Sequence, residues 1–153
     1  MGYEISVETV SAETIAAVRA RVRIGEIAGA WKPALDRVWA FLRARPGLHA
    51  GGHNLFLYQH PLQRGDPMEV DFGVQVTHAF EAADGVACVQ TPSGEVARTL
   101  HRGPYQQLSG AHDAIHAWAA ALKRGIGAAS WETYGDWCAD EAELETTVTY
   151  LLR

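Results

Sequence analysis

The sequence is poor in several features that mark particular classes of protein. Its two cysteines, Cys88 and Cys138, form neither a CxxC metal motif nor a disulfide framework, so both are expected to be reduced thiols. The glycine-rich phosphate-binding patterns of nucleotide-binding proteins do not occur either. The sequence therefore predicts a protein without a cofactor.

Basic residues and long apolar runs are also scarce. The 13 Lys and Arg residues are outnumbered by 18 Asp and Glu, and the formal net charge is -5. Because phosphate contacts need clustered basic residues, no direct nucleic-acid binding is expected. Apolar stretches such as residues 117–122 are far shorter than the roughly 20 residues that span a bilayer, and the N-terminus lacks the pattern of a secretory signal. We therefore expect a cytoplasmic protein that does not bind membranes.

The first half of the sequence contains a strand, a helix and two further strands. Strict alternation of apolar residues with arginine over residues 18–23 predicts a half-buried strand. Apolar residues between 27 and 42 recur at spacings of three and four, which is typical of an amphipathic helix; Pro33 either begins its regular part or kinks it. Strands are expected at 55–60 and 70–76.

The second half repeats this order. A strand is predicted at 96–102, a helix follows Pro104 and ends near Gly125, and strands are predicted at 131–134 and 146–152. Two shorter features lie outside this order: a strand over residues 3–10 and a hairpin, with strands at 78–81 and 86–90, around the turn signal Asp84-Gly85.

These 153 residues can bury one core, so a single domain over residues 1–153 is expected. The recurring order predicts an internal duplication, with repeat 1 at about 15–77 and repeat 2 at about 95–152. The predicted fold class is α+β: duplicated strand-helix-strand-strand units form one antiparallel sheet, with two helices on one face and a central ligand groove.

The tetrapeptide Trp131-Glu132-Thr133-Tyr134 is the strongest candidate for a ligand site. Side chains alternate along a strand, so Glu132 and Tyr134 share a face, as do Phe56 and Tyr58 on the corresponding strand of the first half. If a twofold axis relates the repeats, one carboxylate lies among three rings and favours a flat or lipophilic cation. Two alternatives stay open: Glu132 lies on a solvated face, or it pairs with a strand arginine such as Arg98.

His112 and His116 have the i, i+4 spacing of a zinc-binding helix, with Asp113 where a metalloprotease has glutamate. No third ligand is evident, and on a helical wheel His112 lies at the edge of the apolar stripe with His116 further out. A boundary or surface position is therefore expected for both, and no metal site is predicted.

Three parts of the second half together resemble the GyrI-like family of small-molecule-binding domains, which also serve as effector domains of AraC-type and MerR-type regulators. They are Gly103-Pro104-Tyr105, the helix with Ala111-His112 and Ala117-Trp118, and the segments 131–136 and 145–152. The resemblance extends from about residue 15 to residue 152 and implies the same duplicated fold around a central groove. It also implies a stand-alone member, because the sequence has no room for a helix-turn-helix domain.

The resemblance further implies what the groove binds. Multidrug-binding members hold lipophilic cations against an acidic residue among aromatic rings, and here Glu132 is the equivalent acid. The implied ligand-binding residues are Glu132, Tyr134, Phe56, Tyr58, Trp39, Tyr105 and Tyr150, with Trp31, Trp137 and His101 as weaker candidates. Two alternatives remain: hydrolysis of cyclopropane-bearing natural products with Glu132 as the catalytic residue, and regulation of a partner protein such as DNA gyrase.

Overall fold

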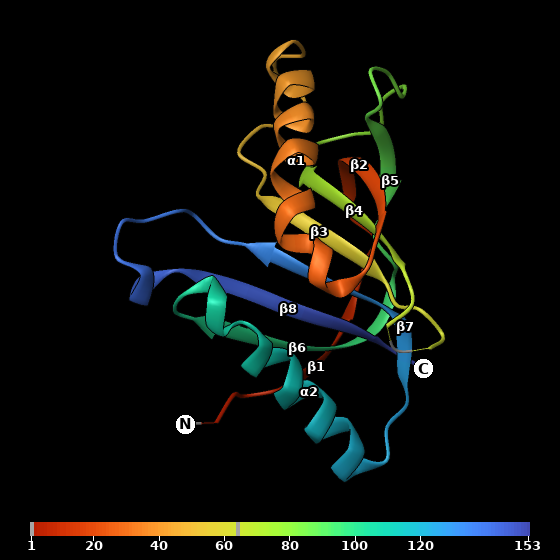
Figure 1. Cartoon of the computed structure of the whole chain (residues 1–153), viewed down its shortest axis with the longest axis vertical. Helices are drawn as coiled ribbons and strands as arrows, with labels where there is room; N and C mark the ends of the chain where they lie inside the picture. Colours follow the sequence, from red (N-terminus) through yellow and green to blue (C-terminus); the bar gives the residue numbers. More distant parts are fainter. Residues whose placement is uncertain (1, 64) are drawn as a thin grey trace. The chain divides into compact units, whose positions relative to one another are not determined.

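The computed structural model describes residues 2–63 and 65–153, which form two compact units. Unit 1 consists of the N-terminal segment up to Ser11 together with Pro92–Arg153, and unit 2 is Ala12–Thr91. Each unit combines antiparallel strands with one long helix (Figure 1). The α+β class predicted from the sequence is confirmed.

Unit 2 contains four strands in the order β3-β4-β2-β5, all neighbours antiparallel. Its elements are β2 (Thr14–Val22), the 3-10 turn η1 (Ile24–Glu26), α1 (Ile27–Arg43), β3 (Asn54–Gln59), β4 (Met68–Gln75) and β5 (Ala87–Gln90). Helix α1 packs against β2 and β4. The apolar stripe predicted from spacings of three and four makes this contact, through Ala34, Leu35, Val38, Phe41 and Leu42.

Two details of unit 2 differ from the sequence-based expectations. Helix α1 begins at Ile27 and runs through Pro33, so this proline does not mark the start of the regular helix. The strand predicted at 78–81 is wrong: Thr77 donates its backbone N–H to the carbonyl of Leu48, and the ring of Phe80 packs on Phe41 of α1. The chain therefore leaves the sheet, and only the bridge between Ala83 and Val86 closes the Asp84-Gly85 turn.

Unit 1 contains four antiparallel strands in the order β1-β6-β8-β7. Its elements are β1 (Ser6–Val10), β6 (Gly94–Arg102), the 3-10 turn η2 (Tyr105–Gln107), α2 (Ser109–Leu122), β7 (Ile126–Tyr134), the 3-10 turn η3 (Glu141–Glu143) and β8 (Glu145–Leu152). Lys123 ends α2 in the left-handed conformation, with φ of 55°. Strand β7 then begins at Ile126, five residues before the start predicted from the sequence.

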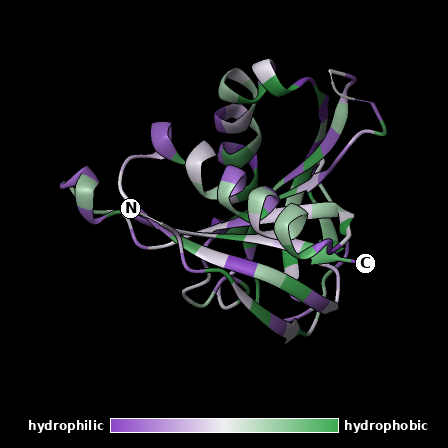
Figure 2. Ribbon diagram, turned by 90° about the horizontal axis from the view of Figure 1, so that it is seen from below, coloured by the Kyte–Doolittle hydropathy of each residue, from purple (hydrophilic) through white to green (hydrophobic). Residues whose placement is uncertain are grey.

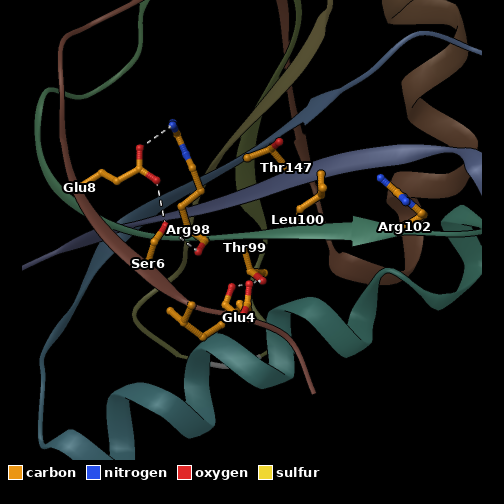
Figure 3. Close-up of a pocket in the computed structure, with 9 residues that line it drawn as sticks. Glu4, Ser6, Glu8, Arg98, Thr99, Leu100, Arg102 and Thr147 are labelled. Atoms are coloured by element: carbon orange, nitrogen blue, oxygen red, sulfur yellow. Dashed lines mark hydrogen bonds and ion pairs between the residues drawn. The ribbon is translucent and has the colours of Figure 1, made fainter. Parts of the chain in front are cut away.

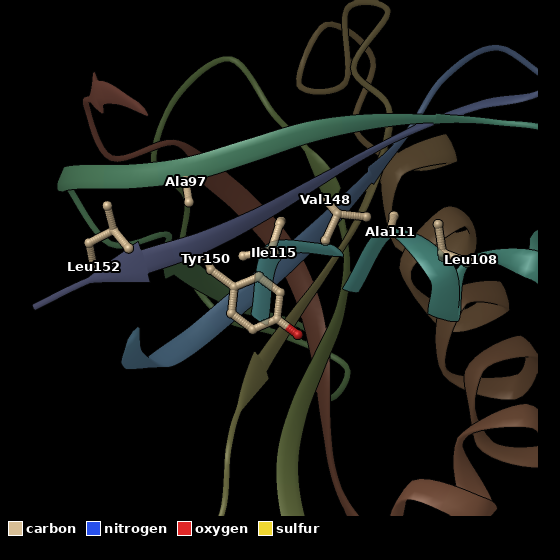
Figure 4. Close-up of a cluster of buried hydrophobic side chains, with 7 residues drawn as sticks. All are labelled: Ala97, Leu108, Ala111, Ile115, Val148, Tyr150 and Leu152. Atoms are coloured by element: carbon tan, nitrogen blue, oxygen red, sulfur yellow. The ribbon is translucent and has the colours of Figure 1, made fainter. Parts of the chain in front are cut away.

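The core of unit 1 lies between α2 and the sheet. Its buried members are Ala97, Leu108, Ala111, Ile115, Val148, Tyr150 and Leu152 (Figure 4). Hydrophobic and hydrophilic residues interleave along the helices and strands of both units (Figure 2). The order strand-helix-strand-strand occurs as β2-α1-β3-β4 in unit 2 and as β6-α2-β7-β8 in unit 1. A duplication and a groove between the repeats stay predictions.

Candidate functional site

Strand β7 turns three polar side chains toward α2. In the ladder with β8, Ser130 pairs with Tyr150, Glu132 with Val148 and Tyr134 with Thr146. Because Val148 and Tyr150 belong to the core beneath α2, their partners on β7 lie on that same face. The prediction that Glu132 and Tyr134 share a face is confirmed, since the Tyr134 hydroxyl donates a short hydrogen bond to Oε1 of Glu132.

Glu132 is buried, with a relative exposure of 6%. Its second carboxylate oxygen, Oε2, lies 2.6 Å from Nε2 of His112 on α2. A buried carboxylate without donors would be strongly destabilising, and these two hydrogen bonds compensate part of that desolvation. The alternative of a solvated Glu132 is therefore wrong.

Pairing of Glu132 with Arg98 is also wrong, because Arg98 has other partners. Its guanidinium lies 3.3 Å from Oε1 of Glu8 and donates to the Thr149 hydroxyl at 3.1 Å. This ion pair borders a shallow pocket of unit 1 that Glu4, Ile5, Thr99, Leu100, Arg102 and Thr147 also line (Figure 3). The residues that line this pocket do not include any of those predicted to bind ligand.

His112 is a member of the site that the sequence did not identify. Besides Glu132, it contacts Tyr150, whose hydroxyl lies 2.7 Å from Nδ1. An ionised carboxylate only accepts hydrogen bonds, so Nε2–H of His112 donates to Glu132. In a neutral ring, Nδ1 then accepts a hydrogen bond from the Tyr150 hydroxyl. The expected boundary position described its burial but not its partners. The sequence had drawn attention to it only through its i, i+4 spacing with His116 and as part of the Ala111-His112 segment that resembles the GyrI-like family.

Tyr150 is buried, and this burial raises the pKa of its phenol to about 12. A hydrogen bond with Ser130 acts in the opposite direction, while the negative charges of Glu132 and Asp113 raise the pKa further. At neutral pH the phenol is therefore protonated and can donate to His112. Ser130, Tyr150, His112, Glu132 and Tyr134 thus form a continuous chain of polar contacts, here called the Glu132 cluster.

Aromatic rings extend from this cluster toward solvent. Tyr105, which is 40% exposed, packs edge-on against Tyr134 with a centroid distance of 5.7 Å. His116 is exposed, and its ring lies edge-on to Tyr150 at 5.0 Å. Tyr105 and Tyr134 therefore give a half-exposed aromatic approach to a buried carboxylate.

The weaker candidates of unit 1 lie elsewhere. His101 is 2% exposed, and both of its ring nitrogens have hydrogen-bond partners. The Tyr3 hydroxyl lies 2.8 Å from Nδ1, and the Pro104 carbonyl oxygen lies 3.0 Å from Nε2. This arrangement anchors the N-terminal segment. Trp137 is 75% exposed in the connection that follows β7.

The remaining predicted residues belong to unit 2. Phe56 and Tyr58 are buried on β3, and Phe56 lies on the face covered by α1, where its ring meets Trp31 at 6.4 Å and Phe72 at 4.9 Å. Trp39 donates its indole N–H to Oδ1 of Asn54 at 3.1 Å, and so helps fix α1 on the sheet. Their approach to Glu132 stays a prediction.

Two further observations concern metals and membranes. Within residues 2–63 and 65–153, no three His, Cys, Asp or Glu side chains gather as a metal site would require. Nδ1 and Nε2 of His112 instead face a tyrosine and a glutamate. In the same part of the chain, neither helix has the length and hydropathy needed to cross a membrane.

Comparison with known proteins places the fold. The model of the GyrI-like small molecule binding domain matches residues 3–152. No curated protein matches the sequence. The crystal structure of the EcmrR C-terminal domain is similar with a TM-score of 0.81 and 19% identity, over 100% of this chain and 99% of that one.

Two other solved structures share the fold at lower identity. SAV2435 bound to tetraphenylphosphonium matches with a TM-score of 0.76 and 14% identity, over 98% of this chain and 94% of that chain. A hydrolase encoded by lin2189 from Listeria innocua matches with a TM-score of 0.67 and 11% identity, over 99% of this chain and 93% of that chain.

Proposed function

This chain belongs to the family of GyrI-like small-molecule-binding domains, and we propose that it binds lipophilic aromatic cations against the carboxylate of Glu132. The observation that carries the proposal is the burial of this carboxylate, 6% exposed, beside the rings of Tyr134 and Tyr150. SAV2435, which has a similar fold, was solved with tetraphenylphosphonium, a cation that carries four phenyl rings.

The charge of Glu132 and the aromatic rings act together on such a ligand. A lipophilic cation loses little hydration on entering an apolar site, and it then meets a carboxylate in a medium of reduced dielectric. Tyrosine faces add a cation–π attraction of about 0.5 to 2 kcal/mol each. A neutral ligand of the same shape gains the ring contacts but not the charge term.

The proposal also includes the aromatic residues of unit 2 that the sequence predicted to bind ligand. Phe56 and Tyr58 stand on β3, the counterpart of β7 in the order of elements, and Phe56 faces α1 as Glu132 faces α2. We therefore assign Phe56, Tyr58 and Trp39 to the ligand together with Tyr105, Tyr134 and Tyr150. The indole N–H of Trp39 is bonded to Asn54, so Trp39 would contact the ligand through its aromatic ring alone.

The direct test is calorimetric titration with tetraphenylphosphonium and with the neutral triphenylphosphine oxide. In Glu132→Gln the affinity for the cation should fall about 10- to 100-fold, while the affinity for the neutral compound stays within about threefold. The matched control is Glu81→Gln, the same change at an exposed glutamate of unit 2. Equal losses for both ligands, or an equal effect of the control, would contradict the proposal.

Hydrolysis is a second candidate, favoured by the acid–base groups gathered around Glu132. Glu132 contacts His112, and His112 contacts the protonated phenol of Tyr150, so a base and a donor lie in one chain of hydrogen bonds. In this alternative Glu132 activates water, or stabilises positive charge that develops on an electrophilic cyclopropane. Product formation that is lost in Glu132→Gln, in a variant that still binds the neutral compound, would establish turnover; binding without product would exclude it for that substrate.

A further inference from the structure

The contact between His112 and Glu132 gives the site a second ionisable group, and we infer that His112 sets its preference between cationic and neutral ligands. With a neutral His112 the pair carries the negative charge of Glu132. With a protonated His112 the pair is neutral overall, and a cation loses its advantage over a neutral compound. The inference rests on the proposed function and adds a residue that determines specificity.

The short distance and the burial make the charge of His112 act strongly on Glu132. Nε2 of His112 lies 2.6 Å from Oε2 of Glu132, whose side chain is 8% exposed, whereas the side chain of His112 is 22% exposed. Charges at such a distance and burial are only weakly screened by salt. The partial exposure of His112 leaves its ring open to exchange of protons with solvent.

The charged and titratable groups around His112 come from three elements. Strand β7 contributes Glu132, and β8 contributes Tyr150, whose raised pKa keeps it neutral throughout the range concerned. Helix α2 itself carries Asp113 and His116 as neighbours in sequence and on the next turn. Strand β6 turns His101 toward α2, but Tyr3 and Pro104 occupy both nitrogens of that ring.

The sign of the effect follows from these charges. Loss of the proton of His112 removes a positive charge beside Glu132 and strengthens cation binding, so the affinity for the cation should rise with pH. By linkage, a bound cation favours the neutral ring, so cation binding is coupled to the release of a proton. For a neutral ligand, the affinity does not depend on the charge of His112, and binding releases no proton.

The experiment measures affinity for tetraphenylphosphonium and for triphenylphosphine oxide between pH 5.5 and 8, in the wild-type chain and in His112→Gln. The glutamine side chain keeps an N–H donor for Glu132 but has no charge to gain. In the wild-type chain the affinity for the cation should rise about 10-fold or more across this range, and in His112→Gln it should change less than about threefold. The affinity for the neutral compound should be flat in both proteins.

Two measurements keep the result specific to His112. The control variant His78→Gln, in which an exposed histidine of unit 2 is replaced, should keep the pH dependence of the wild-type chain. In the unmutated protein, at the acidic end of the same pH range, addition of tetraphenylphosphonium should shift the imidazole NMR signals of His112 toward those of a neutral ring.

The outcomes separate the two claims. If neither compound binds at any pH, the proposed function fails and this inference fails with it. If both bind but wild-type and His112→Gln show the same pH profile, or if the NMR signals of His112 do not move, the inference alone is overturned.

Discussion

Oε2 of Glu132 on β7 and Nε2 of His112 on α2 lie 2.6 Å apart beneath the helix of unit 1. This contact ties the helix to the sheet through a carboxylate that the core would otherwise exclude. With the Tyr134 hydroxyl at Oε1, it gives the buried carboxylate a hydrogen-bond donor at each of its two oxygens.

Tyr134→Phe tests the other hydrogen bond to Glu132. The substitution removes the hydroxyl that donates to Oε1 and leaves the ring in place against Tyr105. One acceptor of a buried carboxylate then loses its donor, so the free energy of unfolding should fall by about 1 to 3 kcal/mol. Urea denaturation measures it, with Tyr105→Phe at the half-exposed ring as the control. A variant as stable as the control would show that the bond contributes nothing.

Tyr150→Phe tests the buried phenol through alkaline pH. The unfolded chain releases this proton near the ordinary value of about 10, whereas the folded protein holds it until about 12. The contribution of Tyr150 to stability is therefore complete below pH 10 and is lost as the pH rises toward 12. In Tyr150→Phe the loss of stability over this range should be smaller than in the wild-type chain, as followed by urea denaturation at a series of pH values. Identical slopes would contradict the raised pKa.

Ile115→Ala tests whether α2 is held by the core described for unit 1. Ile115 is fully buried against Val148 and Tyr150, and its truncation should reduce the free energy of unfolding by about 2 to 5 kcal/mol. Leu122→Ala, at the exposed end of the same helix, should change it by less than about 1 kcal/mol. Equal effects of the two variants would mean that α2 does not pack as described.

The sequence predicted those parts of the site that depend on local periodicity. Alternation along a strand is sufficient to put Glu132 and Tyr134 on one face, and spacings of three and four are sufficient to identify the buried stripes of α1 and α2. The resemblance to the GyrI-like family, based on the segments around Tyr105, His112 and Glu132, is confirmed by the match over residues 3–152.

Features that depend on contacts between elements could not be predicted in this way. His112 is separated from Glu132 by 20 residues, and a helical wheel gives its exposure but not the strand side chain that faces it. The same limit applies to Asp71 of β4, which is 1% exposed and bonded to Arg19 of the neighbouring strand β2, because the pattern of one strand does not show its partner on the next. The strand predicted at 78–81 does not form, because Phe80 packs against α1 instead of continuing a strand ladder.

The most direct test of the account is a crystal structure of the chain with tetraphenylphosphonium. The account predicts that the phosphonium centre lies within about 6 Å of the Glu132 carboxylate, the range over which an opposite charge acts strongly, with phenyl rings against Tyr134 and Tyr105. A cation bound elsewhere, for example in the pocket beside Arg98, with Glu132 contacting only His112 and Tyr134, would contradict it.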